Sequence, residues 1–402
     1  MTTNDSPRPD KYGRSYLELV LEIDKHIEGY IDAYYGPAEL KTAVFQAPPK
    51  EPAALLDDVA HLQATIPQDD PQRAAYLTAT LRALEGSIRL LTGETLAYPD
   101  EVARLYDINP QPVAESQFEA AHRELDSLLP GTGSLAERME ARRQRYYIDT
   151  DKILPLLELA RAETRQRTAA LIPLPDEEGV EIRLTKGQPW SAYNWYLGNG
   201  RSLIEFNTDV PTSILGLLNT FAHEGYPGHH TESMLKEMQL YRQKGYGEQA
   251  AMLLHSPAAV IAEGIATQAA GMIFADDSEY EWTYATLLPK AGIDTEETAV
   301  EMARIAQASQ QLRYVSGNAT YQYHTGQLTK EQTIAYIQTY SLATPERAAK
   351  SFSFISHPLF RSYIFTYTQG YDLIEQAAKQ TDKTSLFRRL LTEQILPSQL
   401  GS

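Results

Sequence analysis

Apolar residues recur at intervals of three and four positions along most of this 402-residue chain, which is the spacing of amphipathic helices. Proline and glycine interrupt the pattern, so it predicts several separate helices. In the first half, the expected helices cover residues 16–31, 55–66, 74–91, 102–106, 118–129, 136–147 and 153–171. The helical spacing resumes at residue 212 and continues to the C-terminus. We therefore expect a mainly α fold.

The stretch from residue 172 to residue 209 departs from this pattern, with turn residues and short alternating runs. Its first part is typical of a loop with a small hairpin. Asn199-Gly200 is a strong tight-turn signal, and residues 203–206 fit a short strand. We expect a small β element here. The best internal boundary lies near residue 185, dividing an N-terminal helical part, 1–185, from a second part, 186–402, within one shared core.

Composition restricts the chemistry and the partners. Because the chain contains no cysteine, a metal can be held only by histidines and carboxylates. Lys and Arg total 36 against 53 Asp and Glu, a net charge of −17, and no basic run could follow a nucleic-acid backbone. No apolar stretch reaches the ~18–20 residues that span a bilayer. The polar N-terminus lacks a secretory signal, so we expect a cytoplasmic protein without nucleic-acid or membrane partners.

The segment TFAHEGYPGHHTESM, residues 220–234, concentrates the chemistry. His223, His229 and His230 lie within eight residues, and Glu224 follows the first of them. The usual helical zinc motif, His-Glu-x-x-His, places two imidazoles one turn apart. Here Pro227 stands where the second histidine would be, so two residues are inserted before the next histidine.

The spacing leaves the second histidine ligand open. On an undistorted helix, a residue six or seven places on lies about 9–10 Å further along the axis, too far to share a metal. The dipeptide Pro227-Gly228 could break the helix and return His229 to His223. A different bulge would bring His230 there instead. We favour His229 and keep His230 as the alternative.

The first histidine points away from the apolar face of its helix. That face is the stripe Ile214, Leu217, Leu218 and Phe221. His223 lies roughly 200° around the helix from Phe221, at 100° per residue. A structural histidine would more often lie on the stripe.

The third ligand is expected from residues 256–275, where Glu263 is the only charged residue among small and apolar ones. Ser256 and Pro257 form a good helix start. Such a helix is expected to be buried, and a lone buried carboxylate needs a metal or a cationic side chain. Gly264 and several alanines would let another helix approach closely.

Two histidines and one carboxylate leave a coordination position open, which is typical of catalytic zinc sites and not of structural ones. We expect one zinc ion per chain, held by His223, His229 and Glu263, with Glu224 as the general base that activates water. The strand at residues 203–206 could bind an extended peptide by its free edge. The expected substrate is a peptide or a small amide.

These residues resemble the bacterial group known as domain-of-unknown-function family 885. The resemblance rests on HEGYPGHH and Glu263-Gly264, and on residues 28–40, 193–211 and 354–374. It implies a zinc-dependent peptidase whose multi-helix fold is similar to the Thermus-aquaticus-type metallocarboxypeptidases. Alignment of Gly228-His229 with the Gly-His of that fold favours His229. The two-residue insertion departs from the His-Glu-x-x-His pattern of those carboxypeptidases.

A hydrolase of this kind needs a donor for the oxyanion of its tetrahedral intermediate. Tyr367, in the closing segment that resembles the family, is the first candidate. Tyr363 and His324 lie in the same part of the chain. Arg313 or Arg361 could bind a substrate carboxylate, with a structural ion pair as the alternative for each.

The sequence is also compatible with other functions. The same site would serve a metal-dependent hydrolase of a non-peptide amide or ester, or persist in a non-catalytic peptide-binding protein with a decayed site. A helical di-iron protein needs two Glu-x-x-His motifs. The chain offers one, Glu119 to His122.

Overall fold

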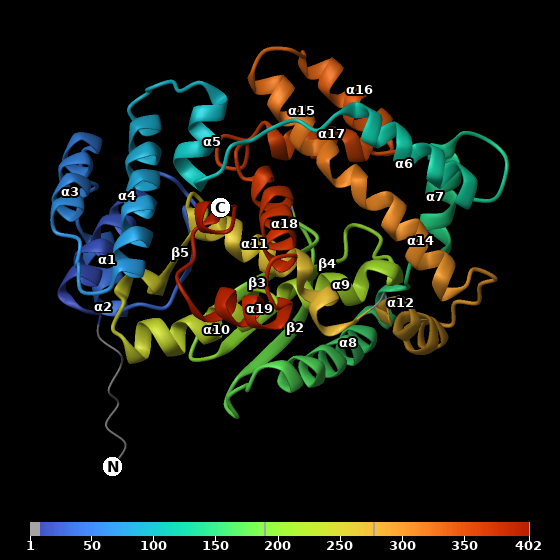
Figure 1. Cartoon of the computed structure of the whole chain (residues 1–402), viewed down its shortest axis with the longest axis horizontal. Coiled ribbons are helices and arrows are strands. Elements are labelled where there is room, and N and C mark those ends of the chain that lie inside the picture. The colour runs from blue at the N-terminus through green and yellow to red at the C-terminus, as the bar shows by residue number, and fades with distance from the viewer. Residues whose placement is uncertain (1–8, 189, 276–277, 402) are drawn as a thin grey trace.

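The computed structural model describes residues 9–188, 190–275 and 278–401, and the mainly α prediction is confirmed. The first half is helical, as the spacing predicts (Figure 1). Its helices are α1 (Lys11–Asp24), α2 (Ala38–Gln46), α3 (Pro52–Ala64), α4 (Pro71–Leu91), α5 (Tyr98–Tyr106), α6 (Glu115–Leu128), α7 (Leu135–Arg145) and α8 (Thr150–Leu171).

The second half contains the remaining helices, joined by short π-helical and 3₁₀ turns. They are α9 (Ile214–Glu224), α10 (His229–Lys236), α11 (Pro257–Ile273), α12 (Ser278–Trp282), α13 (Leu288–Ala291), α14 (Ala299–Gln310), α15 (Val315–His324), α16 (Lys330–Tyr340), α17 (Pro345–Ile355), α18 (Ile364–Ala378) and α19 (Lys383–Thr392). The predicted start of α11 is confirmed, since the Ser256 side chain accepts from the Ala259 N–H before the first-turn Pro257.

The first helix is shorter than predicted. It ends at Asp24, and the chain turns through Gly29, at φ 78°, into strand β1 (Ile31–Tyr34). The Asp24 carboxylate accepts the N–H of Ile31, 3.0 Å away. Strand β1 pairs antiparallel with β5 (Ala251–Leu253), so this distant partner overrides the helical spacing at Ile31.

The central β element is a three-stranded sheet in the order β2 (Gly179–Thr185), β4 (Arg201–Asn207), β3 (Ala192–Gly198). Asn199-Gly200 forms the predicted tight turn between β3 and β4, both residues with positive φ. Strand β2 joins β4 in parallel register instead of forming a hairpin with its own loop. Strand β4 is the middle strand, so the expectation that its free edge binds substrate is wrong; β3 is an edge strand of this sheet.

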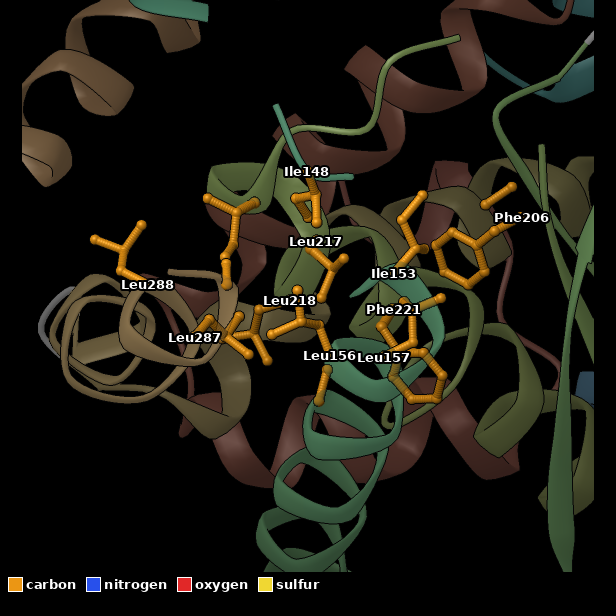
Figure 2. Close-up of a cluster of buried hydrophobic side chains, with 14 of the residues drawn as sticks. Ile148, Ile153, Leu156, Leu157, Phe206, Leu217, Leu218, Phe221, Leu287 and Leu288 are labelled. Carbon is orange, nitrogen blue, oxygen red and sulfur yellow. The ribbon is translucent and has the colours of Figure 1, made fainter. Parts of the chain in front are cut away.

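A core beneath this sheet fixes the orientation of α9. Figure 2 shows buried side chains of α8, α9 and β4 packed together with Leu287 and Leu288. The predicted stripe of α9 is part of this core: Ile214, Leu217, Leu218 and Phe221 are each at most 2% exposed. Burying one such side chain is worth about 1.5–3 kcal/mol. The opposite side of α9, with His223, therefore faces α11, which carries Glu263.

Helices α11 and α18 cross at the centre of the molecule (Figure 1). A Cβ on Gly370 would lie 2.3 Å from the carbonyl oxygen of Val260, and one on Gly264 2.6 Å from that of Gly370. The two glycines thus allow backbone contact between the helices, as the small residues of α11 predict. Among the described residues, no single helix is long and apolar enough to cross a membrane. One bent pair, Pro257–Ile273 with Ser278–Ala291, meets the length and composition criteria only when the two helices are taken together.

Candidate metal centre

The chain breaks between α9 and α10, and this break brings two histidines together. Gly228 donates its N–H to the carbonyl of Ala222, 3.0 Å away. A Cβ on Gly228 would lie 1.9 Å from the carbonyl oxygen of His223, so only glycine fits there. The Tyr226-Pro227 peptide bond is cis. The His229 ring comes to 4.8 Å from the His223 ring, centroid to centroid.

Three potential ligand side chains converge at this point. His223 Nε2 lies 3.5 Å from Glu263 Oε2, and His229 Nε2 lies 3.8 Å from Glu263 Oε1. One donor atom from each residue lies within 4.8 Å of the others. Glu263 Oε2 is buried and has no hydrogen-bond partner in the described part of the chain. An orphaned carboxylate oxygen between two imidazoles is a site that a cation would complete.

The protonation states of these groups suit a metal. Burial lowers the pKa of His229 to about 4 and also lowers that of His223, so both imidazoles are neutral ligands at neutral pH. Burial raises the pKa of Glu263 well above its ordinary value, so its charged form requires a cation nearby. Two nitrogens and one carboxylate fit zinc.

Helix α18 adds two phenols to the site. The Tyr363 hydroxyl donates to Glu263 Oε1 at 2.6 Å and so orients that carboxylate. The Tyr367 ring lies nearly parallel to the His223 ring, with centroids 6.5 Å apart. Across residues 9–188, 190–275 and 278–401, the Tyr367 hydroxyl has no hydrogen-bond partner, and it is not sealed off from solvent.

Glu224 ends α9 beside the three ligands. Its carbonyl accepts a hydrogen bond from the Asn194 side chain on β3, which ties the sheet edge to the site. Burial raises the pKa of Glu224 to about 8, and the charge of Asp32 adds to this effect. Among the described residues the Glu224 carboxylate forms no ion pair, and the backbone N–H of Asn194 offsets part of the rise in its pKa.

Sequence reasoning missed Asp32. This residue lies on β1, one position beyond the helix expected over residues 16–31, and the Tyr193 hydroxyl of β3 donates to one of its oxygens. Burial raises the pKa of Asp32 to about 7. No helical or strand pattern marks Asp32, because its place depends on the pairing of β1 with β5 and on the hydrogen bond from Tyr193 of β3.

The other histidine of the motif is held away from the three ligands. His230 is fully buried, with Nδ1 2.8 Å from Ser202 Oγ and Nε2 3.1 Å from Glu178 Oε2. Since a carboxylate only accepts, the ring donates to Glu178 and accepts from Ser202. Both ring nitrogens are thus occupied, and the structure brings His229, not His230, to His223 and Glu263.

Two further candidates from the sequence have partners elsewhere. The Arg361 guanidinium pairs with Glu101, with Nε 2.9 Å from Oε1. His324 Nε2 lies 2.8 Å from the carbonyl oxygen of Ile355, and its ring stacks on Tyr98 at 4.7 Å. Their contacts are those of packing residues.

Arg313 also lies among its own neighbours. Its guanidinium lies over the Tyr371 ring, 3.9 Å from the centroid, and its Nε donates to the carbonyl of Gln310 at 2.9 Å. Of the four residues considered for substrate binding, Tyr363 alone contacts one of the three converging ligands in the part of the chain that the structure describes.

Comparison with known proteins supports the fold more than the activity. No family model and no curated protein matches the chain, so the family-885 resemblance stays a prediction. A candidate lipoprotein from Colwellia psychrerythraea aligns with 99% of this chain and 76% of its own, with 14% identity and a TM-score of 0.55. A candidate lipoprotein of unknown function from Shewanella oneidensis covers 98% and 73%, with 12% identity and a TM-score of 0.48.

The M32 carboxypeptidase from Deinococcus radiodurans aligns over 97% of this chain and 88% of its own, with 11% identity and a TM-score of 0.39. At these identities, the Colwellia protein shows a shared mainly helical fold and nothing about chemistry. The Shewanella and Deinococcus proteins have TM-scores below 0.5, and nothing is concluded from them.

Proposed function

We propose that this chain is a zinc-dependent hydrolase that cleaves peptide bonds. One observation carries the proposal: His223, His229 and Glu263 converge around a buried carboxylate oxygen that has no partner among the described residues. Two imidazoles and one carboxylate leave zinc an open position, as in catalytic sites. Zinc bound there would polarise the substrate carbonyl and make water acidic enough to attack at neutral pH.

The remaining steps belong to side chains of this chain. Glu224, buried and without an ion-pair partner among the described residues, accepts a proton from the attacking water and delivers it to the leaving amine. Tyr367 keeps a free hydroxyl that can donate to the carbonyl oxygen as negative charge develops on it. Tyr363 is already bonded to Glu263, so its role is to orient the ligand.

The test combines metal analysis with one substitution. We expect about one zinc per purified chain, and hydrolysis of a peptide library, read by mass spectrometry. Glu224→Gln should keep the zinc and lose activity by at least ~10²-fold, the lower end for lost acid–base catalysis. The matched control is Glu181→Gln, at an exposed position on β2 outside the site, which should retain both.

Two results would contradict the proposal. A zinc-free protein that still hydrolyses peptides, or an unchanged rate in Glu224→Gln, would remove the metal mechanism. A zinc-loaded chain that cleaves no peptide would exclude the peptidase. The positions of the cuts distinguish removal of C-terminal residues from internal cleavage.

A further inference from the structure

Asp32 stands next to the proposed machinery without a role in it. Burial is the main cause of the raised pKa values of Glu224, Glu263 and Tyr367, and the negative charge of Asp32 raises each of them further. Tyr193 and Asn194 are neighbours on β3: the first donates to the Asp32 carboxylate and the second to the Glu224 carbonyl, so Asp32 lies near the end of α9 that carries Glu224. Asp32 comes from β1, far from the others in sequence.

Asp32 is only partly satisfied. The Tyr193 hydroxyl donates to Oδ1, and Oδ2 has no hydrogen-bond partner within the described ranges. No lysine or arginine in those ranges lies within ion-pair distance of Asp32 or Glu224, and Glu263 has only the two imidazoles. A partly buried carboxylate without a cationic partner is costly unless a ligand supplies the charge.

Asp32 brings one more carboxylate to this part of the molecule, so the sign of the charge on a substrate group placed beside it matters.

Three aromatic rings, Trp190 before β3 and Tyr193 and Trp195 on it, lie beside Asp32, to which Tyr193 donates its hydrogen bond. The Tyr193 ring lies between two tryptophans, 5.5 Å from the Trp190 ring and 4.5 Å from the Trp195 ring, centroid to centroid. Trp195 is 38% exposed. Aromatic faces beside a carboxylate are a typical environment for ammonium and guanidinium groups, through cation–π attraction and charge-assisted hydrogen bonds.

We propose that Asp32 is a specificity-determining residue that binds a positively charged group of the substrate, an ammonium or a guanidinium, close to the bond that is cleaved. This inference rests on the proposed hydrolase function. Such a group comes either from a free peptide N-terminus or from a lysine or arginine side chain. Tyr193 fixes the carboxylate by its hydrogen bond. A substrate carboxylate in the same place would be repelled.

The test uses the zinc-loaded full chain and peptides of one length that share a cleavable bond. The set pairs a free with an acetylated N-terminus, and lysine with glutamine beside the bond. We expect kcat/KM for one cationic peptide to exceed that of its neutral partner about tenfold or more. Asp32→Asn should bring this ratio close to one with zinc content retained, whereas Asp57→Asn, an exposed control on α3, should keep it.

A binding experiment separates this inference from the proposed function. Calorimetry with zinc-loaded Glu224→Gln measures the affinity of the same peptides without turnover, and the double variant with Asp32→Asn should lose the preference for the cationic members. If the wild type binds cationic peptides selectively but cleaves none, the proposed hydrolase function is wrong and the proposed role of Asp32 in binding stands. Cleavage with equal rates for charged and neutral peptides, or a preference that survives Asp32→Asn, overturns the role of Asp32. If the peptides are neither bound nor cleaved, both the hydrolase function and the role of Asp32 are overturned.

Discussion

At the scale of single residues, Glu178 binds His230, the histidine of the motif that lies away from His223, His229 and Glu263. Burial alone would raise its pKa, but hydrogen bonds from His230, Tyr226 and Arg165 outweigh burial and hold the pKa at about 2. The side chain is fully enclosed, so these three donors stabilise a buried charge. Glu178 therefore holds Tyr226, in the segment between α9 and α10, and His230, near the start of α10.

The depressed pKa predicts acid sensitivity. Because the folded pKa of Glu178 lies below the unfolded value of about 4.3, its contribution is present above that pH and is lost as pH falls towards 2. We expect Glu178→Gln to be less stable at pH 6, by about 3 kcal/mol, and to lose less stability than the wild type between pH 4.5 and pH 3. Denaturant unfolding between pH 6 and pH 3 measures both effects. Equal pH slopes for wild type and variant would contradict this role; Glu181→Gln is the exposed control.

The sequence is informative about residues whose signal is local. His223 stands off an apolar stripe, and Glu263 is the lone charge of an apolar helix, so both could be singled out. The choice between His229 and His230 depends on how Gly228 passes the carbonyl of His223, a contact that residue spacing does not encode. Asp32 gave no signal, because its neighbours come from distant strands.

At the scale of elements, the crossing of α11 and α18 sets the position of the phenols. The backbones touch at Gly264 and Gly370, so α18 cannot move closer, and a larger residue would push it away. Tyr367 lies on α18 and Tyr363 directly precedes it, both within about two turns of Gly370. The distance between Tyr363 and Glu263 therefore depends on a contact made by residues without side chains.

This crossing predicts different outcomes for two glycine substitutions. Gly370→Ala should destabilise the protein by about 1–3 kcal/mol through overpacking, and lower activity because Tyr363 and Tyr367 move. Gly271→Ala, on α11 with open space around it, should be neutral or stabilise by up to about 1 kcal/mol. Thermal unfolding and peptide hydrolysis measure the two effects. Equal behaviour of the variants would show that the crossing is not tight.

Helices were easier to predict than strands. The helices predicted in the first half follow from the spacing within their own segments, although α2 is not among them, and the Asn199-Gly200 turn is equally local. The partners of β1 and β2 are distant strands, so neither the end of α1 at Asp24 nor the central place of β4 follows from the sequence near them. The predicted boundary near residue 185 falls at the end of β2, which pairs with β4 on its other side.

At the scale of the whole molecule, the proposed zinc would connect three helices, since its ligands come from α9, α10 and α11. A ligand that binds only the folded state stabilises it by about 4 kcal/mol at a thousandfold excess over its Kd. We expect a chelator to lower the melting temperature of the wild type and of His230→Gln, and to leave that of His229→Gln unchanged. A chelator effect in His229→Gln, or none in His230→Gln, would reverse the assignment of the second histidine.

The fold class could be predicted from the sequence, but the contacts between distant segments could not. A helical period and a lack of cysteine are sufficient to expect a mainly α chain whose metal would be held by histidine and carboxylate. They do not reveal that Glu263 meets Tyr363 or that Asp32 meets Tyr193, because packing between segments far apart in the chain produces these contacts.

The pairing of β1 with β5 has a consequence for synthesis on the ribosome. Ile31 emerges more than 200 residues before its partner Leu253. At about 5–20 residues per second, β1 waits roughly 10–40 s for that partner. Throughout this interval the nascent chain presents an unpaired strand, which is a target for chaperones and for neighbouring chains on the same messenger.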